Sequence, residues 1–211
     1  VVRACTFYNN RTAAQHADRP YPLFMNTPGL KILAPATASD AKGMLKAAVR
    51  DDDPVVIFED INLWNKKEDV PVDPDVLAPI GKALVRREGS DVTIVSVAGC
   101  LPHALKAAEV LAERGISAEV IDLRTIAPLD SETILNSVAR TGRLIVADNS
   151  HKVGSVASEI AAMVCEEGFD TLRRPVRRVT APQVHVPYNG TLEKQLFVTR
   201  DKIVSAVETL D

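Results

Sequence analysis

Four histidines are the side chains of this sequence that could exchange protons near neutral pH. His16 lies in an irregular Gln-His-Ala segment, and loops on a rigid scaffold often carry functional residues, so it is either an acid–base group or an ordinary loop histidine. His151 follows a predicted strand, at the edge where open parallel sheets bind ligands. His103, on the outward face of a predicted helix, and His185, between two valines, are expected to be a solvated side chain and a loop histidine.

The run Asp51-Asp52-Asp53 could bind a cation. It ends a predicted helix, where acidic side chains oppose the helix dipole, and carboxylates and free carbonyls are the ligands of hard cations. The alternative is a solvated acidic turn. Asp122 and Arg124 lie at a predicted strand end, and we expect them to pair locally and hold the turn.

Composition and motifs exclude several classes of function. No glycine-rich nucleotide fingerprint, phosphate loop, HExxH or GxSxG sequence is present. A net charge of −3 gives no reason to expect nucleic acid or a membrane as partner, and no apolar run reaches the roughly 20 residues of a membrane span. Three cysteines without CxxC spacing are expected to stay reduced, as small core residues in a cytosol-like compartment.

The elements that must position these residues are those of a parallel α/β sheet. Residues 91–125 read as strand, glycine turn, amphipathic helix, glycine stop and strand, which is a βαβ unit. Further predicted strands at 80–87, 144–147 and 176–180, with intervening helices, complete a three-layer α/β domain after residue 79. In front of it, Thr37 caps a predicted helix over 38–50, a strand follows at 54–58, and 62–79 reads as a linker.

The sequence resembles a known family in five ordered segments. They are Gln15-His16, PGLKILAPATASDAKGMLKAAVRDDDPVVIFE (28–59), EGSDVTIVSVAG (88–99), EVIDLRTIAPLD (119–130) and TGRLIVADNSHKVGSVASEIAA (141–162). They are similar to the β subunit of thiamine-diphosphate-dependent 2-oxo acid dehydrogenases, the decarboxylating component of the pyruvate, branched-chain and acetoin complexes.

The resemblance implies a domain organisation. Residues 1–61 would be part of a pyrimidine-binding α/β domain, 62–78 a linker, and 79–211 a transketolase C-terminal-type domain. The latter would be a three-layer α/β/α domain with a five-stranded mixed sheet of order 1-3-2-4-5 and an antiparallel first strand. Because the chain opens on VVRACT, which reads as the interior of a strand, we expect the first domain to begin upstream of Val1.

The resemblance also implies site residues. His16 matches the active-site histidine of the family's Gln-His-Ser motif, proposed to assist proton transfer around acylation, although Ala17 replaces the serine and FYNNR replaces a glycine-rich approach. The glutamate that activates thiamine diphosphate is expected upstream of Val1, and magnesium would be held by an α subunit. A potassium loop, with largely main-chain ligands, matches Ala48, Val49, Asp51 and Asp53.

The implied function is decarboxylation of a 2-oxo acid, with pyruvate favoured, on thiamine diphosphate and transfer of the acyl group to lipoamide. Expected partners are an α subunit, a second β subunit and a dihydrolipoyl acyltransferase core, in the bacterial cytoplasm or the mitochondrial matrix. Arg173 and Arg174 stand where many members carry an acidic residue near the acyltransferase-docking surface. Two alternatives remain: a non-catalytic dimerisation and docking module, and a relative of transketolase or deoxyxylulose-phosphate synthase.

Overall fold

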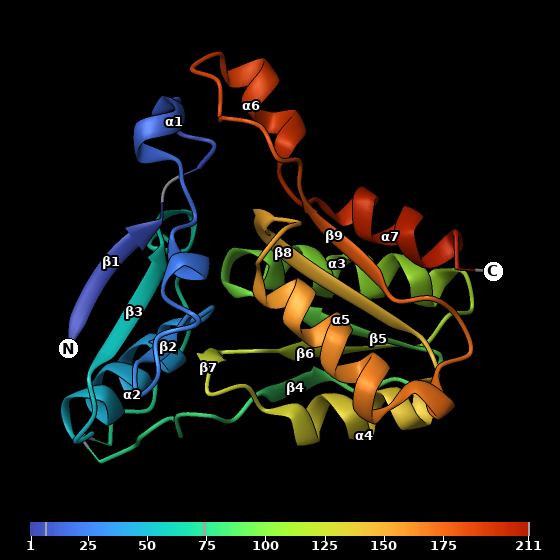
Figure 1. The fold of residues 1–211 in the computed structure, drawn as a ribbon, viewed down its shortest axis with the longest axis horizontal. Coiled ribbons are helices and arrows are strands. Elements are labelled where there is room, and N and C mark those ends of the chain that lie inside the picture. The colour runs from blue at the N-terminus through green and yellow to red at the C-terminus, as the bar shows by residue number, and fades with distance from the viewer. Residues whose placement is uncertain (7, 74, 211) are drawn as a thin grey trace.

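The computed structural model describes residues 1–6, 8–73 and 75–210. These residues form two sheets that stand side by side, a four-stranded one that contains the N-terminus and a five-stranded one to its right in Figure 1. Among the described helices, none has the length and apolar character that crossing a membrane would require.

The first sheet has the strand order β1-β3-β2-β7. Strands β1 (Val2–Thr6), β3 (Val55–Asp60) and β2 (Lys31–Leu33) are parallel, and β7 (Thr125–Ala127) is antiparallel to β2. Helix α2 (Ala38–Val49) packs on this sheet and is capped at Thr37, whose hydroxyl accepts a hydrogen bond from the Asp40 amide as predicted. The short helix α1 (Ala13–His16) and the 3₁₀ turns Tyr21–Leu23 and Ile61–Leu63 lie in the connections.

The second sheet has the order β4-β6-β5-β8-β9, with β4 (Leu84–Arg87) antiparallel to β6 (Ala118–Asp122). Strands β5 (Val92–Ser96), β8 (Leu144–His151) and β9 (Arg177–Ala181) run parallel to β6. In order along the chain, this sheet is 1-3-2-4-5 with an antiparallel first strand. The fold class expected from the family resemblance is therefore confirmed.

Helices cover both faces of the second sheet (Figure 1). Helix α3 (Leu101–Glu113) and helix α7 (Arg200–Glu208) pack together on one face, and α4 (Ser131–Thr141) and α5 (Val156–Glu167) on the other. The short helix α6 (Gly190–Leu196) instead extends beyond the sheet, beside α1. Single-turn 3₁₀ helices precede α3 at Ala98–Cys100 and follow α5 at Phe169–Thr171.

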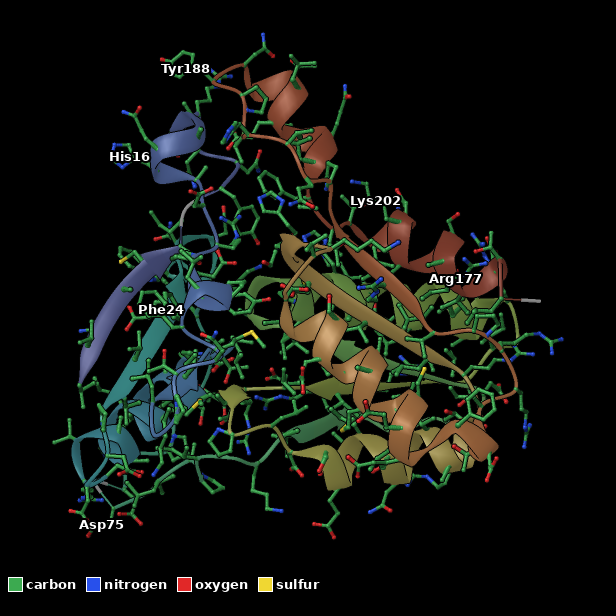
Figure 2. All side chains as sticks on the ribbon, viewed as in Figure 1. His16, Phe24, Asp75, Arg177, Tyr188 and Lys202 are labelled. Atoms are coloured by element: carbon green, nitrogen blue, oxygen red, sulfur yellow. The ribbon has the colours of Figure 1, made fainter. Side chains whose placement is uncertain are left out.

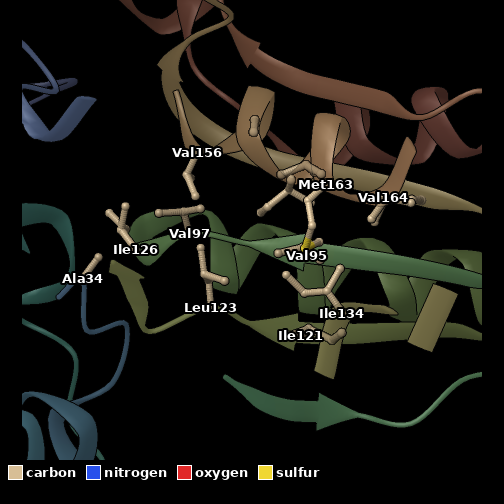
Figure 3. Close-up of a cluster of buried hydrophobic side chains, with 14 of the residues drawn as sticks. Ala34, Val95, Val97, Ile121, Leu123, Ile126, Ile134, Val156, Met163 and Val164 are labelled. Carbon is tan, nitrogen blue, oxygen red and sulfur yellow. The ribbon is translucent and has the colours of Figure 1, made fainter. Parts of the chain in front are cut away.

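Strand β7 was not predicted from the sequence, and it joins the two sheets. β7 follows β6 after two residues but pairs with β2, so that Ile32 lies opposite Ala127 and Leu33 opposite Thr125. The apolar cluster under α4 and α5 therefore continues from the second sheet to Ala34 at the end of β2 (Figure 3). A chain segment of the second domain completes the first sheet, which fixes the two sheets relative to each other.

A buried charge network reinforces this junction. Arg124 Nη1 donates to Asp40 Oδ1 at 3.2 Å, and Arg86 bridges Asp40 to Asp122. Arg124 and Asp122 therefore take partners from α2 and β4, and the expectation that they pair with each other is wrong. The reason is topological: the turn between β6 and β7 carries Arg124 toward the N-terminus of α2, which the sequence alone does not place there.

Asp122 makes the junction sensitive to pH. Burial raises its pKa to about 6, and its Oδ1 has no hydrogen-bond partner among the described residues. Because the folded-state pKa lies above the value of 3.8 for an unperturbed aspartate, this group favours the folded state below pH 4. That contribution is lost as the pH rises through about 6, and the shift of about 2 units corresponds to about 3 kcal/mol.

We therefore expect Asp122→Asn to flatten this dependence. The amide oxygen can still accept from Arg86, and the amide nitrogen can take the place of the unpartnered oxygen. Melting temperatures of both proteins from pH 4 to 7 test this, since the variant should gain stability relative to the parent as the pH rises. Parallel curves would show that Asp122 does not titrate in this range.

Candidate functional site

His16 lies at the end of α1, with its side chain exposed. Figure 2 shows it on the outer side of α1, at the same end of the molecule as Tyr188, which precedes α6. Its helix has one turn only, so local hydrogen bonds cannot fix it. Contacts on either side of His16 in the chain must therefore hold the imidazole in place.

Residues of the second domain pack under α1. Ala17 is buried against Tyr8, Val186 and Phe197 in a small apolar cluster. The rings of Tyr8 and Phe197 lie 4.6 Å apart between centroids. Ala17 thus lies in a hydrophobic contact, where its methyl side chain needs no hydrogen-bond partner.

Arg19 lies beside this cluster. Its guanidinium carbon is 4.0 Å from the centroid of the Tyr8 ring and 5.2 Å from that of Phe197, and protein encloses its Nε and Nη2 atoms. Nη1 donates to the main-chain carbonyls of Ala17 at 2.8 Å and Asp18 at 3.1 Å. Burial lowers the pKa of Arg19, opposed by the negative charge of Asp60 and Asp148.

Glu193 holds the approach to α1 on its other side. This carboxylate is completely buried and accepts hydrogen bonds from the amides of Asn10 at 3.2 Å and Arg11 at 3.0 Å. Asn9, Arg11 and Ala13 all have φ between 56° and 58°, which non-glycine residues adopt only when surrounding contacts impose it. Glu193 supplies such contacts.

The carboxyl ends of the two sheets meet near Arg19. Asp60 ends β3 and accepts from the Asn62 amide at 3.0 Å. It lies so close to Gly99, in the 3₁₀ turn before α3, that a methyl group there would overlap it. Asp148 in β8 accepts from the Tyr21 hydroxyl and from the Ser150 amide. Burial raises the pKa of both carboxyls, Asp60 and Asp148. On the outer side of Asp60 a cavity of about 370 Å³ opens between β1, the N-terminus of α2 and Trp64.

Two of the other histidines border this group: His151 lines a small pocket with Ala17 and Arg19, and His103 interacts with the charge of Asp60. His151 Nδ1 is 2.9 Å from the Pro182 carbonyl oxygen, an arrangement that holds the end of β8, and His185 is exposed in a loop. His103 was expected to be solvated, but it is half-buried, and burial lowers its pKa. Cys5, Cys100 and Cys165 are free, as expected, but Cys5 and Cys165 are exposed instead of lying in the core.

The acidic turn after α2 contains a positive charge of its own. Lys31 Nζ lies 2.7 Å from Asp51 and 3.2 Å from Asp53, and the hydrogen bond from Lys31 lowers the pKa of Asp51. The main-chain carbonyl of Ala48 accepts from the Asp51 amide. No cluster of metal-ligating side chains is found within the described ranges, so a potassium ion here would depend on main-chain oxygens, and the site stays a prediction.

Arg19, Glu193, Asp60 and Asp148 were not identified from the sequence. Arg19 stands in a proline-containing loop, and Glu193 reads as a solvated residue of a short polar helix. No local pattern marks these contacts, because Glu193 binds the amides of Asn10 and Arg11 and Arg19 lies over Phe197, each more than 100 residues away in the chain.

Two sequence families match the chain. Residues 81–203 match the family described as "Transketolase, C-terminal domain", and residues 1–65 match "Transketolase, pyrimidine binding domain". The first match alone covers more than half of the chain. The boundaries predicted at residues 61 and 79 are compatible with these ranges and stay a prediction.

Curated relatives extend the match. The β subunit of acetoin:2,6-dichlorophenolindophenol oxidoreductase from Bacillus subtilis is 48% identical over 195 residues, which are 92% of this chain and 57% of the relative. The 2-oxoisovalerate dehydrogenase β subunit of the same organism is 43% identical over 212 residues, which are 100% of this chain and 64% of the relative. The chain thus spans less than two thirds of the length of these relatives.

A solved structure agrees with these matches. A protein described as "Split gene transketolase, inactive beta4 tetramer" has a TM-score of 0.79 and 26% identity, covering 99% of this chain and 64% of its own. Its β subunits formed a tetramer that is described as inactive. The chain is 40–48% identical to β subunits of pyruvate, 2-oxoisovalerate and acetoin enzymes. It therefore belongs to the transketolase C-terminal domain family, and the part of the chain in front of that domain matches the transketolase pyrimidine-binding domain.

Proposed function

We propose that this chain belongs to the β subunit of a thiamine-diphosphate-dependent 2-oxo acid dehydrogenase. The protein would decarboxylate a 2-oxo acid, with pyruvate favoured, and transfer the acyl group to lipoamide. Identity above 40% to several β subunits, over nearly the whole chain, carries this proposal. Its partners would be an α subunit, a second β subunit and a dihydrolipoyl acyltransferase core.

The buried carboxylates beside Arg19 and α1 are the first candidates for one part of a thiamine site, its activating carboxylate. Thiamine diphosphate supplies a nucleophilic carbon and takes up the electrons released by decarboxylation, and it needs a carboxylate against its pyrimidine ring. The buried carboxylates beside Arg19 and α1 already have protein partners: Asn62 for Asp60, Tyr21 for Asp148, and the amides of the 8–13 loop for Glu193. We therefore propose that another carboxylate activates the cofactor.

His16 is the residue of this chain that we propose to act on the reacting groups. Its imidazole is exposed at the end of the molecule where both sheets present their carboxyl ends, so an acyl-accepting group could reach it. An imidazole can give or take a proton near neutral pH, and lipoamide must exchange protons when its disulfide opens. His16 would hold and move that proton.

The proposed function is tested by assembling the protein with its α subunit, thiamine diphosphate and magnesium. We expect release of carbon dioxide from pyruvate that depends on thiamine diphosphate, with 2-oxoisovalerate as the comparison substrate. Failure of every 2-oxo acid to react would contradict the proposal. Sugar-phosphate ketol transfer under the same conditions would instead favour a transketolase or deoxyxylulose-phosphate synthase relative.

The second candidate is a non-catalytic module for dimerisation and docking. The β4 tetramer of the split-gene relative favours it, because β subunits there associate in a form described as inactive. Calorimetric titration of residues 1–211 with thiamine diphosphate separates the two proposals. Tight binding would contradict the module, and absence of binding by these residues alone is the result that it requires.

We also propose that potassium binds at the turn of Ala48, Val49, Asp51 and Asp53. Lys31 already neutralises the carboxylates, so main-chain carbonyls would supply most of the binding. Replacing potassium by choline should lower stability by about 1 kcal/mol when potassium was present at roughly tenfold its dissociation constant. An unchanged melting temperature of the assembled protein would remove this site from the proposal.

A further inference from the structure

The contacts around α1 show that residues 189–198 of the second domain hold the segment that carries His16. We propose that Glu193 and Arg19 are positioning residues, which set the place of the His16 imidazole for acyl transfer. This inference rests on the proposed function of His16. Neither residue touches a reacting group; each acts through the main chain on one side of His16.

The first contact fixes the chain before α1. The two carboxylate oxygens of Glu193 each accept one amide hydrogen, Oε1 from Asn10 and Oε2 from Arg11. A buried carboxylate is stable only when charge-assisted hydrogen bonds of this kind satisfy it, so the loop and the helix hold each other. The adjacent Gly190 leaves room for the Arg11 side chain, because a Cβ there would lie 2.7 Å from Arg11 Nε.

The second contact fixes the chain after α1. Arg19 Nη1 binds the carbonyls of Ala17 and Asp18, the two residues that follow His16. The guanidinium is held in turn by the faces of Tyr8 and Phe197, where a cation is attracted by the ring electrons. Removing the guanidinium would release both carbonyls.

Residues 189–198 are themselves anchored to the second domain. Lys202 of α7 donates to the carbonyls of Gln195 at 2.6 Å and Phe197 at 2.7 Å. The Val198 amide donates to Asn149 Oδ1 at 2.9 Å. Glu193 and Phe197 therefore connect the His16 segment to a rigid helix and to β8, although α6 itself extends beyond the sheet (Figure 1).

The test uses the protein assembled with its α subunit and compares the variants Glu193→Ala and Arg19→Met with the parent. The control is Gln195→Ala, which removes an exposed side chain from α6, the helix that carries Glu193. Misplacing a reacting group by about 1 Å costs on the order of 100-fold, so the first two variants should lose about that factor with lipoamide as acceptor. The rate of pyruvate-dependent reduction of 2,6-dichlorophenolindophenol, which requires no acyl transfer to lipoamide, should change little. Gln195→Ala should match the parent with both acceptors.

Conservative variants and hydrogen exchange complete the test. Glu193→Gln keeps one acceptor oxygen and Arg19→Lys keeps the charge, so both should recover part of the lipoamide rate. Amide exchange of residues 8–19 should become about tenfold faster in Glu193→Ala and Arg19→Met, with melting temperatures within about 3 °C of the parent.

Two results would overturn the inference: unchanged exchange of residues 8–19, or equal losses with both acceptors. Exchange is measured without substrate, so it reports on positioning even if the protein decarboxylates no 2-oxo acid. Failure to decarboxylate any 2-oxo acid would count against the proposed function alone.

Discussion

Replacing Asp40 by alanine is expected to lower the free energy of unfolding by about 3–5 kcal/mol. Asp40 and Arg124 are both nearly inaccessible to solvent, and their ion pair joins α2 to the turn between β6 and β7. Without Asp40, Arg124 would remain buried, with the carbonyls of Lys82 and Ala83 as its hydrogen-bond acceptors among the described residues. Thr37 would also lose the carboxylate to which its hydroxyl donates.

A double-mutant cycle separates this pair from general damage. In Asp40→Ala with Arg124→Met no unpaired charge is left at the pair, so the double variant should be more stable than the sum of the single losses by about 2 kcal/mol. Urea unfolding of the four proteins measures this coupling, and Asp52→Ala, an exposed acid after the same helix, should change stability little. Additive losses would show that Asp40 does not act through Arg124.

Local chemistry in the sequence was enough to predict most elements. Thr37 was identified as a helix cap, and its hydroxyl accepts the predicted hydrogen bond from the third residue after it. The short strand β7 was missed because three residues carry no periodic pattern, and its pairing with β2 depends on a contact across more than 90 residues. Helix α6 was not predicted, because its sequence is polar and shows no apolar face. Glu193 is its buried residue, and α6 packs on the 8–13 loop of the first domain through this side chain.

Some residues of the candidate site could also be predicted from the sequence, and others could not. His16 could be proposed because a family motif surrounds it, and the structure places it at the end of the molecule where both sheets present their carboxyl ends. The residues that hold it could not be proposed, since an arginine in a loop and a glutamate in a short helix are ordinarily solvated. Only the tertiary structure shows that Arg19 lies over the rings of Tyr8 and Phe197 and that Glu193 is buried.

Replacing His16 by alanine is expected to lower the rate of acyl transfer to lipoamide by about 100- to 10,000-fold, the range typical of a general acid or base. Because the side chain is exposed and ends a one-turn helix, its loss should leave the melting temperature of the assembled protein nearly unchanged. The proposed role concerns the proton exchanged as the lipoamide disulfide opens. The rate of dye reduction, which bypasses that step, should therefore fall far less than the rate with lipoamide.

The matched control for this prediction is His185→Ala, since His185 is also exposed but lies in a loop outside α1. It should leave both rates unchanged. A parent-like lipoamide rate in His16→Ala would contradict the proposed role of His16 in proton transfer. It would not bear on the requirement for thiamine diphosphate, which is measured separately in the assembled protein.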